Sequence, residues 1–291
     1  MSTTQADRYP SRVGGTTGGL QPRRDPVVWG GLDTRGPLGR EDLARYEDLG
    51  FLVRPDLFGP SEVESVRREL EDLAEAPSLA SSDLLVREPD GDGVRSIFDA
   101  DLLSTQVAAM VEDHRLVGVA EQLLGSPVYR YQCRVNYKPA FEGRPFAWHS
   151  DFETWHVEDG MPSMRALSIS VALTPNKASN GPLMLVPGSQ QCFLACAGDT
   201  PDDHFRVSLR NQQHGVPDGQ HLEELIAPRG IELILGDPGS AVFFDCNVMH
   251  GSSGNMSPYP RVNLFVVFNS VDNRIVEPFG GRRHRPAFLG R

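Results

Sequence analysis

The sequence predicts a mainly β fold with flanking α-helices, in which a double-stranded β-helix (a cupin-like jelly roll) is buttressed by N-terminal helices. Up to about residue 124, apolar residues recur at helical spacing. From Val128 onward, short β segments alternate with turns such as Asn180-Gly181-Pro182 and Gly236-Asp237-Pro238-Gly239. Many short strands that follow a helical part are typical of a jelly roll packed against helices.

The N-terminal part should hold helices that follow an extension. Residues 1–37 are rich in Gly, Pro, Ser, Thr and Arg, so we expect a partly flexible extension whose first twenty residues are mobile. Gly50 should end the first helix, and Ser61 should cap the second while Glu64 reaches back to its first turn. The expected elements are a helix over 40–49, a strand over 51–53, a helix from Ser61, a loop over 78–94, and helices over 100–112 and 114–124.

The second part of the chain should form the barrel. An insertion at about 190–229 is polar, and we expect it to cover one mouth of the barrel as a lid. We therefore expect residues 38–291 to form a single domain. The expected strands are 128–138, 146–151, 166–174, 183–187, 231–235, 240–246 and 261–271.

Composition and charge narrow the function. The formal net charge of −11 argues against nucleic acid as a partner, because phosphate repels an acidic surface. The four cysteines have the spacing of neither a disulfide framework nor a zinc site, which suits a reducing cytoplasm. The N-terminus lacks the apolar stretch of a signal peptide, and no segment approaches the ~20 apolar residues of a membrane helix, so we expect a cytoplasmic protein.

A His-x-Asp pair marks the candidate metal site. In an extended strand, His149 and Asp151 project from the same face, and His250 follows a second apolar run. Two imidazoles and one carboxylate suit the non-haem Fe(II) of oxygenases. The alternative is a surface turn, which is the commoner context of such a tripeptide. The flanking Trp148 and Trp155 favour a dry metal site instead.

Such an iron site needs a co-substrate, and 2-oxoglutarate, a dianion, needs a fixed cation. Arg261 opens an apolar strand eleven residues after His250, and Arg binds carboxylate through a planar two-pronged contact. The alternative is an edge-strand arginine paired with an acidic neighbour. Over 131–138 the residues alternate strictly, and inside a barrel one polar row would line the pocket: Gln132, Arg134, Asn136 and Lys138.

The remaining histidines are expected to play no direct part in the chemistry. His156 is either an outer partner of the metal site or exposed to solvent. The basic segment Arg282-Arg283-His284-Arg285 should be a solvated terminus. Surface positions are expected for His114, His204, His214, His221 and His284.

The run Phe146 to Met161 (FAWHSDFETWHVEDGM), with 132–139 before it and 180–189 after it, closely resembles the ectoine hydroxylases of the phytanoyl-CoA dioxygenase-like group. The resemblance extends over nearly the whole chain. It implies a jelly roll that uses Fe(II), 2-oxoglutarate and O2 to hydroxylate the compatible solute ectoine to 5-hydroxyectoine, with release of succinate and CO2, and it suggests a homodimer. Relatives often have Pro-Gly-Ser-His where this chain has Gln190 in the last position, which puts only local lid contacts in doubt.

The resemblance also implies roles for individual residues. The iron ligands would be His149, Asp151 and His250. The residues near 2-oxoglutarate would be Lys138, Asn136, Ser252 and Arg261. The residues of the ectoine cavity would be Gln132, Arg134, Thr154, Trp155 and Phe265. The alternatives are a related hydroxylase of another small amino acid or solute, and a cupin-like barrel that binds a metal or a sugar without redox chemistry.

Overall fold

Antiparallel strands form the centre of the fold in the computed structural model, which describes residues 7–14 and 18–291. The strands are β1 (Gly19–Pro22), β2 (Phe51–Arg54), β3 (Leu85–Arg87), β4 (Val94–Phe98), β5 (Val128–Lys138), β6 (Phe146–His149), β7 (Ala166–Ala172), β8 (Leu183–Leu185), β9 (Cys192–Ala195), β10 (Glu232–Ile234), β11 (Ala241–Asp245), β12 (His250–Ser252) and β13 (Arg261–Ser270). The helices are α1 (Arg40–Leu49), α2 (Pro60–Glu75), α3 (Ala100–Leu103), α4 (Thr105–Val111), α5 (His114–Leu124), α6 (Asp151–Asp159), the 3₁₀ turn η1 (Ser189–Gln191), α7 (Phe205–Ser208) and α8 (Gly219–Ile226).

Two sheets carry the barrel. The larger has the order β2-β11-β7-β13-β5-β4-β3, and the smaller has the order β10-β8-β12-β6. From β5 to β8, and again from β10 to β13, the chain alternates between the two sheets. This alternation is that of a jelly roll and confirms the predicted fold class.

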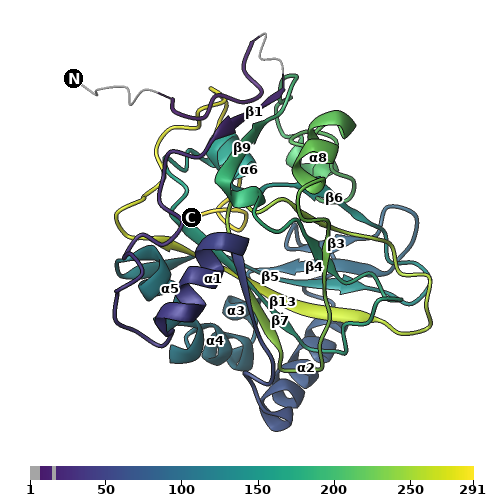
Figure 1. Ribbon diagram of the computed structural model, residues 1–291. Helices are drawn as coiled ribbons and strands as arrows, with labels where there is room; N and C mark the ends of the chain where they lie inside the picture. Colours follow the sequence, from purple (N-terminus) through teal and green to yellow (C-terminus); the bar gives the residue numbers. More distant parts are fainter. Residues whose placement is uncertain (1–6, 15–17) are drawn as a thin grey trace.

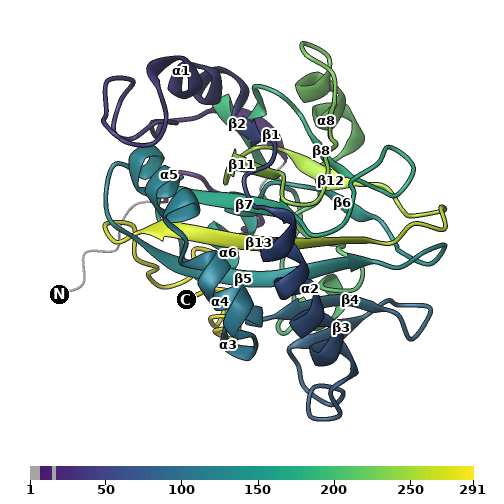
Figure 2. The ribbon, with the colours of Figure 1, turned by 90° about the horizontal axis from the view of Figure 1, so that it is seen from below.

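The helices cover the outer face of the larger sheet. Figures 1 and 2 show α2, α4 and α5 grouped along that face. Cys133 and Val135 of β5 and Leu264 of β13 belong to the same buried apolar cluster as residues of α1, α2, α4 and α5. The alternate positions of both strands therefore face the barrel interior, as the sequence predicts. Within the described residues, no helix combines the length and apolarity needed to cross a bilayer.

Helix boundaries follow local chemistry. The first helix has the predicted bounds, and Gly50 ends it with a positive φ of 83°. The predicted cap of the second helix is wrong: Gly59 is the cap, Pro60 opens the helix, and the Glu62 carboxylate accepts the Gly59 N–H at 2.7 Å. Proline suits the first helical position because its φ is already helical and the N–H it lacks would have no partner there.

Two other predictions over the helical part are wrong. The helix expected over 100–112 is divided, because Ser104 is extended (φ −133°) and its Oγ accepts the N–H of Val107 to begin α4. The loop expected over 78–94 contains β3 and the first residue of β4, which extend the larger sheet. Both differences arise where short elements leave too little periodicity to detect.

The N-terminal segment packs against the rest of the chain over its described part; residues 1–6 and 15–17 lie outside the described residues. Tyr9, Ser11 and Arg12 are buried, and β1 pairs with β9 of the insertion. Arg12 donates from Nε and Nη2 to the Glu153 carboxylate at 2.9 and 3.0 Å and from Nη1 to Glu158 Oε1 at 2.6 Å. The segment thereby supports α6, which holds both glutamates.

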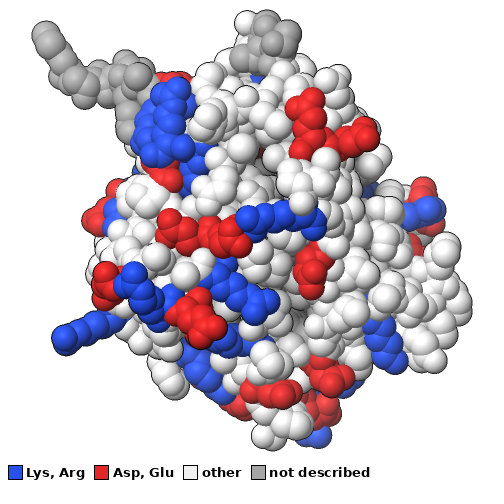
Figure 3. Space-filling view, viewed as in Figure 1, with Lys and Arg blue, Asp and Glu red and all other residues white. Residues whose placement is uncertain are grey.

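The C-terminal segment also differs from the expectation. Arg282, Arg283 and His284 are exposed, as predicted for a solvated terminus. Arg285 is not, because its side chain is only 11% exposed and forms ion pairs with Glu158 and Asp159. Elsewhere, Figure 3 shows acidic and basic side chains interspersed over the face viewed.

We predict that Arg12→Ala lowers the free energy of unfolding by about 3–5 kcal/mol, because it leaves the buried Glu153 and Glu158 with one fewer cation. Urea unfolding at neutral pH measures this change. The matched control is Arg40→Ala, which removes an exposed pair with Asp33 and should change stability by less than about 1 kcal/mol. Equal effects of the two substitutions would contradict the supporting role of Arg12.

Candidate metal centre and cavity

The His-x-Asp pair lies at a junction between a strand and a helix, not within one strand as predicted. β6 ends at His149, Ser150 is still extended (φ −105°, ψ 130°), and Asp151 is the first residue of α6. An acidic side chain in the first turn of a helix is favoured by the helix dipole. This helix is buried on nearly every side, so it lacks the amphipathic pattern by which the sequence could have shown it.

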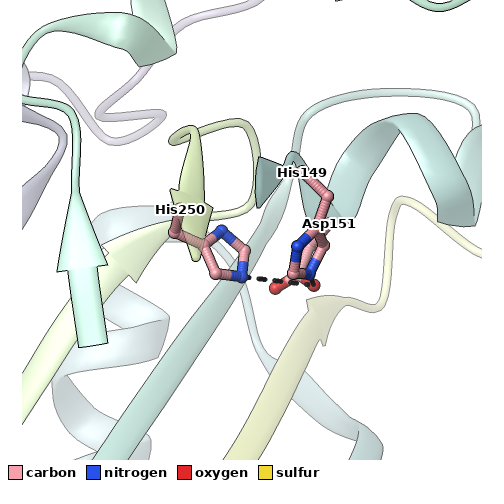
Figure 4. A group of neighbouring side chains, drawn as sticks. All are labelled: His149, Asp151 and His250. Carbon is pink, nitrogen blue, oxygen red and sulfur yellow. Dashed lines mark ion pairs between the residues drawn. The ribbon is translucent and has the colours of Figure 1, made fainter. Parts of the chain in front are cut away.

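Strand pairing brings the third candidate ligand to this junction. β12 pairs antiparallel with β6, and His250 lies opposite His149. Nε2 of His149 is 3.6 Å from Asp151 Oδ1, and Nε2 of His250 is 3.8 Å from the same oxygen (Figure 4). One donor atom from each of the three side chains lies within 4.8 Å of the others. The imidazole of His250 therefore points toward His149 and Asp151.

Neighbouring groups orient the three donors. Nδ1 of His149 lies 2.7 Å from the Ala147 carbonyl, and Nδ1 of His250 lies 2.9 Å from the Val248 carbonyl. Since a carbonyl only accepts, each Nδ1 carries the proton and each Nε2 has a free lone pair. Ser168 Oγ donates to Asp151 Oδ2 at 2.8 Å, which leaves Oδ1 facing the imidazoles. The donor set fits a divalent metal with partly open coordination.

The electrostatics give Asp151 and His250 the protonation states that metal binding requires. Burial raises the pKa of the Asp151 carboxyl, but the charge of His250 and a hydrogen bond with His149 outweigh burial and lower that pKa below its usual range. Burial, with the nearby His149, lowers the pKa of His250 to about 4. At neutral pH the carboxylate is charged and this imidazole is neutral.

A cavity next to the three donors collects most of the predicted site residues. Those that line it are Gln132, Arg134, Asn136, Thr154, Trp155, Ser252, Arg261 and Phe265. They come from β5 and β13 of the larger sheet, β12 of the smaller sheet and α6. Arg134 lies opposite Phe265 in the register of β5 and β13, and its guanidinium is 5.2 Å from the ring centroid of Phe265.

Arg261 is a buried cation, two of whose nitrogens are unpaired among the described residues. It is 1% exposed, and its Nε and Nη1 have no hydrogen-bond partner among the described residues. Burial, together with the charge of Arg95, lowers the pKa of Arg261 to about 9. The edge-strand alternative required an acidic partner, and the described residues supply none. Because a buried guanidinium without an acidic partner is costly, binding of an anion from outside the protein would stabilise it.

Lys138 does not line this cavity, in contrast to the prediction from strand alternation. Its Nζ donates to the Arg144 carbonyl at 2.7 Å and to the Ser253 carbonyl at 2.6 Å. Burial, followed by the charges of Arg261 and Arg95, lowers the pKa of Lys138 to about 6. Lys138 is the last residue of β5, where the loops that follow β5 and β12 close over its side chain.

Several cavity residues were missed from the sequence. Arg95 belongs to β4, which is too short to show alternation, and Arg285 belongs to a segment with the composition of a solvated tail. Neither position had a sequence signal beyond its charge. The other missed residues that line the cavity are Ser96, Phe98, Phe146, Ala147, Leu183, Ser208, Leu209, Gln212, Gly251 and Leu289.

The other histidines stay outside the metal centre. His156 is neither exposed nor a partner of the three donors: it is buried, its Nδ1 lies 2.8 Å from the Met161 carbonyl, and its ring stacks on Phe279 at 4.0 Å. His204 is not a surface residue, since its side chain is 9% exposed and lies 3.4 Å from Glu158. His114 and His284 are exposed, as predicted.

Gln190 contacts α1. Its side-chain amide is fully buried, and Nε2 donates to the Glu47 carbonyl at 2.8 Å and the Asp48 carbonyl at 3.2 Å. The position therefore fastens the start of the insertion to α1 and does not contact the three donors.

Comparison with known proteins identifies the family. Residues 46–263 match the sequence model of the family described as phytanoyl-CoA dioxygenase (PhyH). The chain belongs to this family. The phytanoyl-CoA dioxygenase segment contains His149, Asp151, His250 and Arg261, so the donors and the buried cation lie within the part that defines the family.

Among the curated proteins, the ectoine dioxygenase of Streptomyces avermitilis is 48% identical over 288 residues, which cover 99% of this chain and 97% of the relative. The crystal structure of EctD from S. alaskensis with 2-oxoglutarate and 5-hydroxyectoine has a TM-score of 0.89 and 44% identity, and covers 98% of this chain and 95% of that one. EctD from S. alaskensis with bound Fe has a TM-score of 0.86 and 43% identity, with 98% and 94% coverage. The family fold thus extends over nearly the whole chain.

We predict that His149→Ala and Asp151→Ala each reduce Co(II) affinity by more than about 100-fold, because loss of even an outer partner of a metal ligand typically costs ~10–100-fold. Calorimetric titration measures the affinity, and circular dichroism checks that the variants fold. The control His221→Ala changes a histidine of α8 outside the cavity and should bind Co(II) as wild type does. Wild-type affinity in folded Asp151→Ala would overturn the ligand assignment.

Proposed function

We propose that this protein is an Fe(II)- and 2-oxoglutarate-dependent dioxygenase that hydroxylates ectoine to 5-hydroxyectoine, as 2-oxoglutarate and O2 become succinate, CO2 and the added hydroxyl. The observation that carries the proposal is the presence, at one cavity, of two imidazoles, one carboxylate and an unpaired buried guanidinium. Nearly full-length similarity to ectoine dioxygenases supports the choice of substrate.

His149, Asp151 and His250 would hold the iron, which supplies O2 activation and oxidising power when bound. The protein contributes orientation. The proton on each Nδ1 keeps the Nε2 atoms of the two imidazoles directed at one point, and Ser168 keeps the free carboxylate oxygen there. Because a carboxylate takes the third protein position, no ligand site is vacated for a halide, which disfavours halogenation.

Arg261 would bind the distal carboxylate of 2-oxoglutarate. Its guanidinium can donate in parallel from two nitrogens to the two oxygens of one carboxylate, and its Nε and Nη1 have no partner among the described residues. The charges of Arg261 and Arg95 help burial to lower the pKa of Lys138, Arg95 also lowers the pKa of Arg261, and Glu88 is the carboxylate that acts on Lys138. This end of the cavity thus has more basic than acidic groups, which favours a dianion. Asn136 and Ser252 line the same cavity.

Ectoine, a small ring with a delocalised cationic amidine and a carboxylate, would occupy the aromatic part of the cavity. Trp155 and Phe265 supply flat faces that attract the cationic ring. Arg134 can hold the carboxylate, and its Nη1 already donates to Gln132 Oε1, which fixes the fork of its guanidinium. Thr154, next to Trp155 on α6, adds a hydroxyl to this wall.

The substrate can be tested directly. We predict that incubation of the protein with Fe(II), 2-oxoglutarate, O2 and ectoine gives a product one oxygen atom heavier than ectoine by mass spectrometry, together with ectoine-dependent succinate. Proline derivatives assayed beside ectoine serve as the comparison. Turnover of a proline derivative without turnover of ectoine would reject the substrate and keep the reaction class.

The role of Arg261 can be tested by kinetics. Hydrogen bonds to charged groups are worth ~1.5–3 kcal/mol, so we predict that Arg261→Met raises the KM for 2-oxoglutarate by about 10–100-fold. Arg261→Lys should recover little, because an ammonium cannot make the two-pronged contact. The control Arg67→Met changes an exposed arginine on α2 and should keep the wild-type KM. An unchanged KM in Arg261→Met would refute the assignment.

A further inference from the structure

Arg95 joins three separate segments beside the cavity. It is buried on β4, and its Nε donates to the Leu209 carbonyl of the insertion at 3.1 Å. Nη1 donates to the Arg144 carbonyl at 3.3 Å, and Nη2 donates to the Pro145 carbonyl at 2.9 Å. A single guanidinium therefore links the larger sheet, the insertion and the turn that leads into β6.

The turn into β6 determines where the first candidate ligand lies. The Arg95 guanidinium carbon lies 3.7 Å from the ring centroid of Phe146, which opens β6 three residues before His149. The Glu88 carboxylate connects Arg95 to the turn. Its Oε2 accepts a hydrogen bond from Arg95 Nη1 at 3.2 Å, and its Oε1 accepts one from the Arg144 N–H at 3.2 Å. The turn is thus fixed to β4 by charged hydrogen bonds that are buried or partly buried.

The segment of the insertion that Arg95 holds is part of the cavity wall. Ser208, Leu209 and Gln212 line the cavity, and the apolar side of this segment packs on Val86 and Phe98. Among the described residues, this segment also has an ion pair at the surface, where Arg206 lies 3.4 Å from Asp83 and both side chains are more than half exposed. The buried hydrogen bond from Arg95 to Leu209 therefore holds this wall to the β-sheet more strongly than the exposed ion pair does.

We propose that Arg95 is a positioning residue that holds the wall segment 205–212 closed over the cavity and keeps β6 in place, and that an anion on Arg261 strengthens this hold. Arg95 and Arg261 are buried cations that line the same cavity, so a carboxylate on Arg261 reduces the repulsion between them and stabilises the arrangement in which Arg95 binds the Leu209 carbonyl. Co-substrate binding would in this way complete the cavity for the second substrate.

The first measurement is hydrogen exchange of the backbone amides of 205–212 in wild type and Arg95→Lys. It uses Co(II)-loaded protein with and without 2-oxoglutarate, and no turnover occurs. We expect 2-oxoglutarate to slow exchange of this segment in wild type by at least about tenfold, and to slow it by less than about threefold in Arg95→Lys, because an ammonium cannot reach all three carbonyls. This measurement does not depend on the identity of the second substrate.

The second measurement rests on the proposed function. In Arg95→Lys we expect the KM for ectoine to rise about tenfold while the KM for 2-oxoglutarate changes less than about threefold, since the wall and not the anion site is loosened. A loss of overall stability alone would not separate the two constants. Glu88→Gln/Arg95→Gln removes both buried charges together, so it leaves no unpaired ion, and it should reproduce the faster exchange of 205–212.

The matched control is Arg206→Gln, which removes the exposed ion pair of the same segment with Asp83. It should keep the wild-type exchange and both KM values. Wild-type exchange over 205–212 in both Arg95 variants would overturn the proposal, whether or not ectoine is the substrate. Failure of wild type to act on ectoine, with the expected exchange pattern, would instead reject the proposed function and leave the role of Arg95 supported.

Discussion

The antiparallel pairing of β12 with β6 is the contact on which the candidate centre depends. It sets His250 opposite His149 across about a hundred residues of sequence. Because side chains alternate along a strand, a slip of one residue would turn either imidazole to the other face. The jelly roll prevents such a slip by fixing both strands within a sheet whose apolar side chains already fill the barrel interior.

The helix that follows the pair is held by buried charge. α6 is nearly enclosed, yet it carries Glu153, Glu158 and Asp159. Arg12 comes from the N-terminal segment and Arg285 from the C-terminal segment to compensate these carboxylates. Both ends of the chain therefore position the helix that supplies Asp151, Thr154 and Trp155. Such an arrangement favours one placement of the helix, because any other leaves charges buried without partners.

The two ends of the cavity differ in charge. At the end near Arg261, basic side chains outnumber carboxylates, and two guanidinium nitrogens have no partner among the described residues. Nearer the three donors, aromatic faces and a paired arginine form the wall. The basic end would stabilise a dianion, and the aromatic part would suit a small zwitterionic ring. The chain would thus separate its two ligands by charge within one cavity.

The sequence by itself determined the fold class, the inward row of β5, the inward face of β13 and the candidate triad, because apolar and polar residues alternate with a period that the strand geometry imposes. Only the tertiary structure decided that Asp151 opens a helix, that Lys138 turns to two loop carbonyls, and that Arg12, Arg95 and Arg285 are buried. A charged side chain whose partner lies far away in the sequence produces no periodic pattern from which the pairing could be predicted. Its burial is decided by which carboxylates and carbonyls the folded chain brings within reach.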